Sequence, residues 1–179
     1  MKICCVTFNT YLCVLAWLAL GGCATTDQSK ETNPKKQLTA MRLHCETVQG
    51  GSTPGLEVPI WRARPVLVPI DRDAFVTEAN VLAAAVVDQA GGFAIEIKLD
   101  RQGTWLLEKA TVTNRGRRIA IFCNFGHERW LAAPIITKII SNGRVLFTPD
   151  ATHEEADRIV RGLNNVRRKL DTRSWLKHE

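Results

Sequence analysis

The chain has 179 residues, and its 24 Lys and Arg against 18 Asp and Glu give a formal net charge of +6 at pH 7. This length suits one domain with a buried core and excludes a chain of several large domains. A basic cytosolic chain raises nucleic acid as a partner, but the N-terminus directs this chain to export, so we expect no nucleic-acid partner. Anionic lipid headgroups, cell-wall polymers or a plain solvated surface remain as interpretations of the charge.

Residues 1–22 are typical of an export signal, because Lys2 precedes an apolar run, residues 11–20, that is too short to span a bilayer. The run ends in Leu-Gly-Gly-Cys, and the sequence then turns polar. This stretch resembles the bacterial lipoprotein signal, in which the cysteine is acylated, with palmitate as an expected chain. We therefore predict that Cys23 is lipidated and begins the mature protein. An ordinary signal peptide or an uncleaved anchor is the alternative.

Ala24, rather than an aspartate, follows Cys23. This resembles the pattern of outer-membrane lipoproteins in bacteria with two membranes.

Two cysteines remain for the folded domain once the signal and Cys23 are set aside. Cys45 and Cys123 both stand in strand-like stretches, in phase with apolar neighbours. An oxidising compartment permits a disulfide between them, provided that the two Cα atoms lie within about 7 Å. The alternative is two small buried residues on strands that never meet. The chain has no Cys-x-x-Cys and its four histidines are scattered, so we predict no metal site.

The N-terminal part of the mature chain is predicted to be a tether followed by short strands. Residues 23–40 are polar and indicate a lipid-anchored flexible tether. Alternation over residues 41–48 favours a strand, and the Gly-rich stretch that follows favours a turn. Residues 58–61 and 65–70 are further extended segments whose prolines favour sheet edges or strand starts.

The central part predicts a hairpin, a helix and two more strands. Residues 82–88 and 93–99 flank Gly91-Gly92 as a hairpin whose second strand sends alternate apolar side chains to one face. Thr104 is predicted to cap a helix that ends near residues 114–116. Strands follow at 119–125 and 130–140, and Asn-Gly at 142–143 predicts a hairpin turn into residues 144–148.

A capping box of Thr152 and Glu155 predicts the start of the last helix. Apolar residues follow at helical spacing to residue 170, and Gly162 among them suggests close packing. Residues 171–179 are predicted to be a C-terminal tail. The elements together predict an α+β domain over residues 41–170, with a largely antiparallel sheet and two helices packed in a second layer.

About half of the chain resembles a known family. The motifs are Gly92-Phe-Ala-Ile, Asn114-Arg-Gly-Arg-Arg-Ile-Ala-Ile, Ala133-Pro-Ile-Ile, Asn142-Gly-Arg and Phe147-Thr with Glu154-Glu-Ala. In this order they look like the head subdomain of the first periplasmic domain of the SecD protein-export subunit. The resemblance implies the head fold and a periplasmic interaction role. SecD also carries transmembrane helices, whereas nothing after Cys23 here is apolar over the 18 or more residues of a span, so proton coupling within this chain is not expected.

The sequence contains none of the common hydrolase or metalloprotease motifs, so we expect no enzymatic activity and no cofactor. The polar loop of His127, Glu128 and Arg129 is the candidate interaction site, because loops carry function more often than cores do. The leading hypothesis is a lipid-anchored, non-enzymatic binding or assembly module of the cell envelope. An accessory factor in protein export that contacts unfolded chains is the first alternative, and an enzyme with an unrecognised site is the second. The sequence does not determine the partner in the envelope or the oligomeric state.

Overall fold

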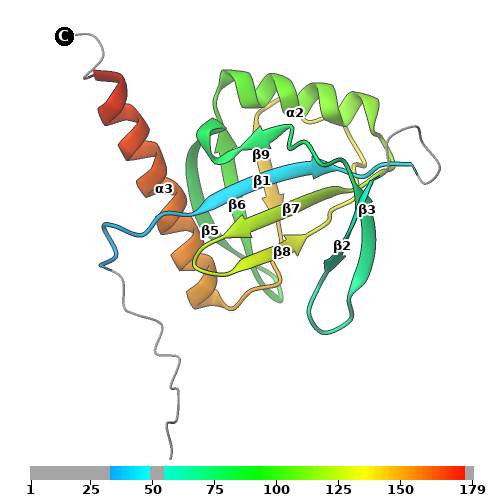
Figure 1. Ribbon diagram of the computed structural model, residues 1–179, viewed down its shortest axis with the longest axis horizontal. Helices are drawn as coiled ribbons and strands as arrows, with labels where there is room; N and C mark the ends of the chain where they lie inside the picture. The colour runs from blue at the N-terminus through cyan, green and yellow to red at the C-terminus, as the bar shows by residue number, and fades with distance from the viewer. Residues whose placement is uncertain (1–32, 49–54, 176–179) are drawn as a thin grey trace, which may run out of the picture. The chain divides into compact units, whose positions relative to one another are not determined.

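Antiparallel strand pairs build most of the fold. The structure, a computed structural model, describes residues 33–48 and 55–175 (Figure 1). Within these residues the strands form three sheets. The first sheet has four strands in the order β4 (Val76–Thr77), β1 (Ala40–Cys45), β7 (Ile119–Asn124) and β8 (Glu128–Ala132). The second sheet pairs β2 (Leu56–Ile60) with β3 (Val66–Ile70). The third sheet has three strands in the order β5 (Val81–Gln89), β6 (Gly92–Leu99) and β9 (Arg144–Phe147). Every pairing between these strands is antiparallel. The predicted α+β class is confirmed, with the strands divided among three sheets.

Two α-helices, α2 (Arg101–Thr113) and α3 (His153–Trp175), and a short 3-10 helix, η1 (Glu78–Asn80), complete the described part of the chain. The cap of α2 is Asp100, whose Oδ1 accepts a hydrogen bond from the Gly103 amide at 2.6 Å. The prediction of Thr104 as the cap was wrong, because an aspartate with the required extended backbone stands four residues earlier. The capping box of α3 is confirmed: the Thr152 amide donates to Glu155 Oε2 at 2.9 Å and the Glu155 amide donates to Thr152 Oγ1 at 3.2 Å.

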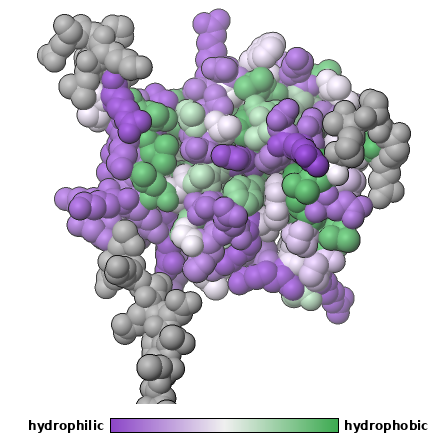
Figure 2. Space-filling model, in the orientation of Figure 1, coloured by the Kyte–Doolittle hydropathy of each residue, from purple (hydrophilic) through white to green (hydrophobic). Residues whose placement is uncertain are grey.

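The main core lies between the four-stranded sheet, the three-stranded sheet and the two helices. The helix α3 contributes Ala156, Ile159 and Leu163, each at most 1% exposed, as its apolar stripe predicts. A second, smaller core packs the β2–β3 hairpin on the four-stranded sheet, through residues that include Val58 and Ile60 against Ala120. Both faces of β7 are therefore covered. Exposed apolar side chains lie on the outside of the β2–β3 hairpin (Figure 2).

The strand predicted over residues 130–140 is wrong in its length and in its partner. The strand β8 ends at Ala132, where Pro134 follows and lacks an amide hydrogen for further pairing. Gly143, with φ of 66°, turns the chain as predicted. The strand after it, β9, pairs with β6 in a register that sets Phe147 opposite Ile95. The Asn-Gly signal thus marked a turn without a hairpin, because a distant strand offered the pairing edge.

The last residues of the predicted tether belong to the folded domain. Asn165 Nδ2 donates hydrogen bonds to the carbonyls of Pro34, at 2.8 Å, and Gln37, at 2.9 Å. Gly162 lies against Thr39, whose hydroxyl, Cβ and amide occupy the space that a Cβ on Gly162 would take. The predicted close packing at this glycine is therefore confirmed. The helix α3 also continues through residues 171–175, part of the predicted tail, because no glycine or proline occurs after Gly162 to end it. The predicted signal, Cys23 and residues 24–32 lie outside the described residues, as do residues 49–54 and 176–179.

Candidate functional site

A groove runs between the last strand of the three-stranded sheet and the segment that leaves β8. Its volume is about 930 Å³, and one wall is made by residues 132–135 and the other by residues 146–150. The two walls meet where the Asp150 amide donates to the Leu131 carbonyl at 2.7 Å. Backbone hydrogen bonds hold the first wall in place, because the Ile119 amide donates to Pro134 O at 3.0 Å and the Ile136 amide donates to Arg117 O at 2.8 Å.

The strand β9 presents an open sheet edge to this groove. Among the described residues, β9 pairs with β6 alone and is the last strand in its sheet. The opposite edge of the same sheet is covered by α3. There the Asn164 side chain accepts from the Ala84 amide at 3.0 Å and donates to the Ala84 carbonyl at 3.0 Å, as a neighbouring strand would. An unpaired edge offers backbone donors and acceptors to another extended chain.

The groove lining includes three large apolar side chains that are accessible. Ile135 is 51% exposed, Leu146 is 49% exposed and Trp61 is 36% exposed. The ionisable side chains among the lining residues are Arg118 and Asp150. Both are engaged with the protein, since Arg118 Nη1 donates to a backbone carbonyl at 3.2 Å and Asp150 accepts from the Arg62 amide at 2.7 Å. The groove therefore offers apolar contact and backbone pairing and holds no pair of free titratable groups.

Trp61 is held in a backbone conformation that L-residues rarely adopt, with φ of 66°. A bulky residue in this left-handed region costs about 1–3 kcal/mol, and such strain concentrates at functional sites. The hydrogen bond from the Arg62 amide to Asp150 Oδ2 fixes the chain immediately after Trp61. The indole is thus positioned at the groove by a contact that links the end of β2 to the segment before α3.

A charged cluster fastens the start of α3 beside the groove. Arg129 donates to both carboxylate oxygens of Glu155, at 3.0 and 2.8 Å, and its side chain is 16% exposed. The hydrogen bond from Arg129 and the hydrogen bond from the Thr152 amide, together with the charges of Arg129 and Arg62, hold the pKa of Glu155 at about 2, below its ordinary value of 4.5. The same interaction raises the pKa of Arg129. Both side chains are charged at neutral pH, and their pairing is structural.

The predicted interaction loop of His127, Glu128 and Arg129 is not at the groove. His127 and Glu128 are exposed at the start of β8, whereas the groove begins at the other end of this strand, at Ala132. Glu128 also accepts a hydrogen bond from Asn124 at 3.2 Å within the turn. Unlike its two neighbours, Arg129 is largely buried, because its side chain is paired with Glu155.

Cys45 and Cys123 do not form the candidate disulfide, and both are free thiols. They lie on the adjacent strands β1 and β7, but the register sets Met41 opposite Cys123 and Cys45 opposite Ile119. Four residues along a strand span about 13 Å, well beyond the separation that a disulfide tolerates. Burial raises the pKa of the Cys45 thiol to about 11 and that of Cys123 to about 12, so both remain protonated.

Ile135 and Leu146 were not found by sequence reasoning, although one signal was present for Leu146. Residues 144–147 alternate, with Val145 and Phe147 buried, so Leu146 had to point outward from a short strand. Trp61 follows the strand β2, and Ile135 follows Pro134. No local sequence pattern places either residue beside Leu146. Two further tryptophans lie away from the groove: Trp105 is exposed on α2, and Trp130 packs near Phe122 and His44.

Neither helix in residues 33–48 and 55–175 is long and apolar enough to cross a membrane. The same residues contain no group of three or more His, Cys, Asp or Glu side chains arranged to hold a metal ion. His153, Glu155 and Asp157 instead serve the start of α3, where His153 Nδ1 lies 3.2 Å from Asp157 Oδ2.

Comparison with known proteins identifies the fold. The family model of the SecDF P1 head subdomain matches residues 59–165. No curated protein matches the chain in sequence. A solved structure of SecDF, a membrane component that enhances protein export, is 20% identical with a TM-score of 0.55, covering 82% of this chain and 71% of that one. The crystal structure of SecDF in a super-membrane-facing form is 19% identical with a TM-score of 0.53; the match covers 72% of this chain but only 19% of that chain. At these identities the structures share the fold, and the family match covers more than half of the sequence. The chain therefore belongs to the SecDF P1 head subdomain family.

Proposed function

We propose that this protein is a lipid-anchored, non-enzymatic binding module of the cell envelope that takes an extended polypeptide segment in the groove beside β9. The observation that carries the proposal is the open edge of β9 next to three accessible apolar side chains, Trp61, Ile135 and Leu146. A segment that adds to a sheet edge gains affinity from main-chain hydrogen bonds, while pockets for alternate side chains give specificity. The groove provides both kinds of contact.

The location follows from the N-terminal sequence. Cys23 after a short apolar signal favours acylation and a periplasm-facing domain, at the outer membrane where the cell has two membranes. Membership in the SecDF head family supports the same side of the membrane. A non-enzymatic role is favoured by the engagement of both ionisable groove residues, Arg118 and Asp150, with other protein groups.

A second candidate function is that of an accessory factor in protein export that contacts unfolded chains. The similar SecDF is a membrane component that enhances protein export, and an unfolded chain supplies the extended segments that a sheet edge accepts. The distinction from the first candidate lies in selectivity. An export factor binds many unfolded chains with little sequence preference, whereas an assembly module binds one defined segment of an envelope partner.

The test is a binding titration of the chain from residue 24 onward with a fluorescent, permanently unfolded polypeptide. Leu146→Asp should weaken binding about tenfold or more, because burying a leucine side chain is worth about 1.5–3 kcal/mol. The matched control is Leu67→Asp, on another exposed strand position, where Leu67 is 62% exposed and outside the groove. Equal loss in both variants contradicts the groove. No binding of this polypeptide by the unchanged protein contradicts the export-factor candidate, which requires binding with little sequence preference.

A second arm tests the backbone pairing itself. Peptides that bind are resynthesised with N-methyl groups on alternate amides, first on one set and then on the other. Pairing along β9 requires only the amides that face the strand, so one methylated set should abolish binding and the other should retain it. If neither set matters, contact is through side chains alone and edge pairing is rejected.

A further inference from the structure

The C-terminal half of α3 forms a basic surface together with the segment that precedes β1. Lys35, Arg168, Lys169 and Arg173 line one shallow hollow with Asn165 and Thr172. The helical members recur at spacings of three and four residues, so they share one face of α3. No carboxylate lines the hollow. We call these four cationic side chains the basic end of α3.

The acidic residues of α3 are too few to neutralise the positive charge of the basic end. Between Arg158 and Trp175, α3 has six Arg or Lys and a single acid, Asp171. Asp171 pairs with Arg167, at 2.8 Å, on the neighbouring face. Basic residues in a last helical turn are favourable to the helix dipole, which accounts for Arg173. The dipole does not explain Lys35, which a different segment brings to the same hollow, so an anionic ligand accounts better for the cluster.

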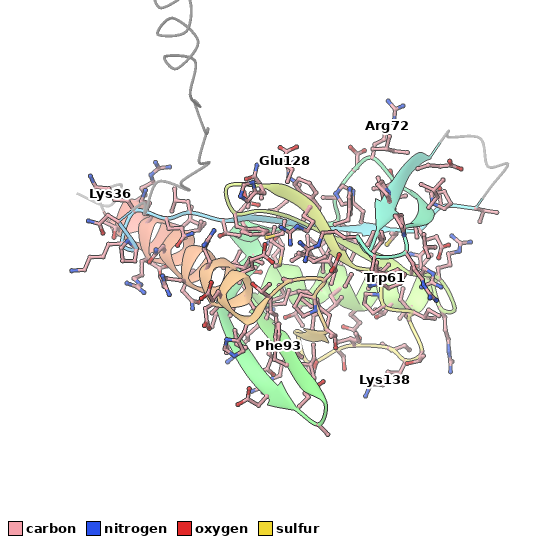
Figure 3. All side chains as sticks on the ribbon, turned by 90° about the horizontal axis from the view of Figure 1, so that it is seen from below. Lys36, Trp61, Arg72, Phe93, Glu128 and Lys138 are labelled. Atoms are coloured by element: carbon pink, nitrogen blue, oxygen red, sulfur yellow. The ribbon has the colours of Figure 1, made fainter. Side chains whose placement is uncertain are left out.

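The position of the hollow along the chain indicates which anion is available. Asn165 holds Pro34 and Gln37 by hydrogen bonds of 2.8 and 2.9 Å, so the chain enters the domain beside the basic end. Only nine residues separate Cys23 from Asn33 in the sequence. Ten peptide steps reach at most about 36 Å, which keeps the basic end close to any bilayer that holds the Cys23 lipid. Figure 3 shows Lys36 beside this part of α3, at the end of the molecule away from Trp61.

We infer that the basic end of α3 binds the anionic phospholipid headgroups of the membrane that holds the lipid anchor, and so orients the domain with its groove away from the bilayer. The choice of this ligand rests on the proposed anchoring at Cys23. Basic side chains near an anionic bilayer each strengthen binding roughly fivefold, and the attraction decays within a Debye length of about 10 Å. Contact with the surface therefore requires the short connection that the sequence provides.

The test measures binding without the lipid, so that its outcome is independent of acylation and of the groove. The chain from residue 24 onward, which keeps every described residue, is sedimented with vesicles of phosphatidylcholine and with vesicles of equal parts phosphatidylcholine and phosphatidylglycerol. We expect binding to the anionic vesicles alone, with loss at high ionic strength. The triple variant Arg168→Gln, Lys169→Gln, Arg173→Gln should lower the vesicle partition constant by tenfold or more.

A triple variant with the same loss of charge is the control. Arg64→Gln, Arg72→Gln and Arg115→Gln are exposed positions outside α3 and should leave the partition constant within about twofold of the unchanged chain. Unaltered thermal unfolding of both variants checks that they fold. Equal loss in the two triple variants would attribute binding to net charge and overturn the inference. Binding to a soluble polyanion, such as purified cell-wall polymer, with none to anionic vesicles would also overturn it. Groove binding by the Leu146 assay is unaffected in either case.

Discussion

Arg129 and Glu155 are joined by two hydrogen bonds, of 3.0 and 2.8 Å, that fasten the start of β8 to the first turn of α3. Glu155 is also the acidic member of the capping box, so one carboxylate serves both the local helix start and a contact between segments 26 residues apart. This double use makes the pair a structural clamp beside the groove.

Arg129→Ala should therefore destabilise the domain by about 2 kcal/mol, because hydrogen bonds to charged groups are worth about 1.5–3 kcal/mol and the carboxylate loses its main partner. Urea unfolding measures this change. The control is His127→Ala, an exposed neighbour whose replacement should change the free energy of unfolding by less than about 0.5 kcal/mol. Equal, small effects in the two variants would show that the clamp contributes nothing.

The stability of the domain should fall in acid partly through Glu155. Its pKa is about 2 in the folded chain against an ordinary value of 4.5, so folding favours the carboxylate. The stabilisation is complete above the ordinary value and is lost as the pH falls from there toward the folded value. Glu155→Gln keeps an acceptor for the Thr152 amide but does not titrate. The decline in free energy of unfolding between about pH 5 and about pH 3 should be shallower in this variant than in the unchanged protein. If the free energy of unfolding fell equally with pH in the two proteins, Glu155 would not be a source of the acid sensitivity.

Gly162→Ala should destabilise the protein, although alanine normally favours a helix by about 1 kcal/mol over glycine. The added Cβ would collide with Thr39, so either α3 or the segment before β1 must move. Overpacking of this kind costs about 1–3 kcal/mol. Adding Thr39→Gly should recover part of the loss, because it removes the hydroxyl and Cβ. Hydrogen exchange of the β1 amides reports the displacement. A stabilised Gly162→Ala variant would show that the contact is loose.

Thiol titration of the unfolded, unreduced domain should find two reactive cysteines, since Cys45 and Cys123 are free. In the folded protein their reaction should be much slower, because burial raises their pKa values to about 11 and about 12. The test uses Ellman-type labelling with and without denaturant. Absence of free thiol after unfolding would restore the disulfide and contradict the register of β1 and β7.

The lipid anchor is tested on the full chain. Cys23→Ala should abolish incorporation of labelled palmitate, and the variant should be soluble or remain uncleaved. The matched control is Cys13→Ala, within the apolar run, which should leave labelling and membrane fractionation unchanged. Normal labelling of the Cys23 variant would reject acylation at this residue. Recovery of the unchanged protein with inner-membrane vesicles would contradict the outer-membrane assignment.

Several features of this protein were determined by local sequence alone. The capping box at Thr152, the apolar stripe of α3 and the alternating strand of residues 93–99 depend on interactions between residues a few positions apart. Gly162 also stood out, because glycine inside a helix is costly unless another chain approaches it. The α+β class followed from the order of these elements.

The tertiary structure decided what these elements touch. Asn142-Gly143 formed its turn, but β9 paired with β6 because the outer edge of that strand was available, which local sequence cannot reveal. Arg129 points inward because it pairs with Glu155 at 2.8 Å. Glu155 is 26 residues away in the sequence, so local sequence does not reveal this contact. The groove likewise exists only where Trp61, Ile135 and Leu146 converge from separate segments. Register and convergence depend on long-range packing, so the sequence predicted the pieces of the domain, and the fold alone placed its candidate site.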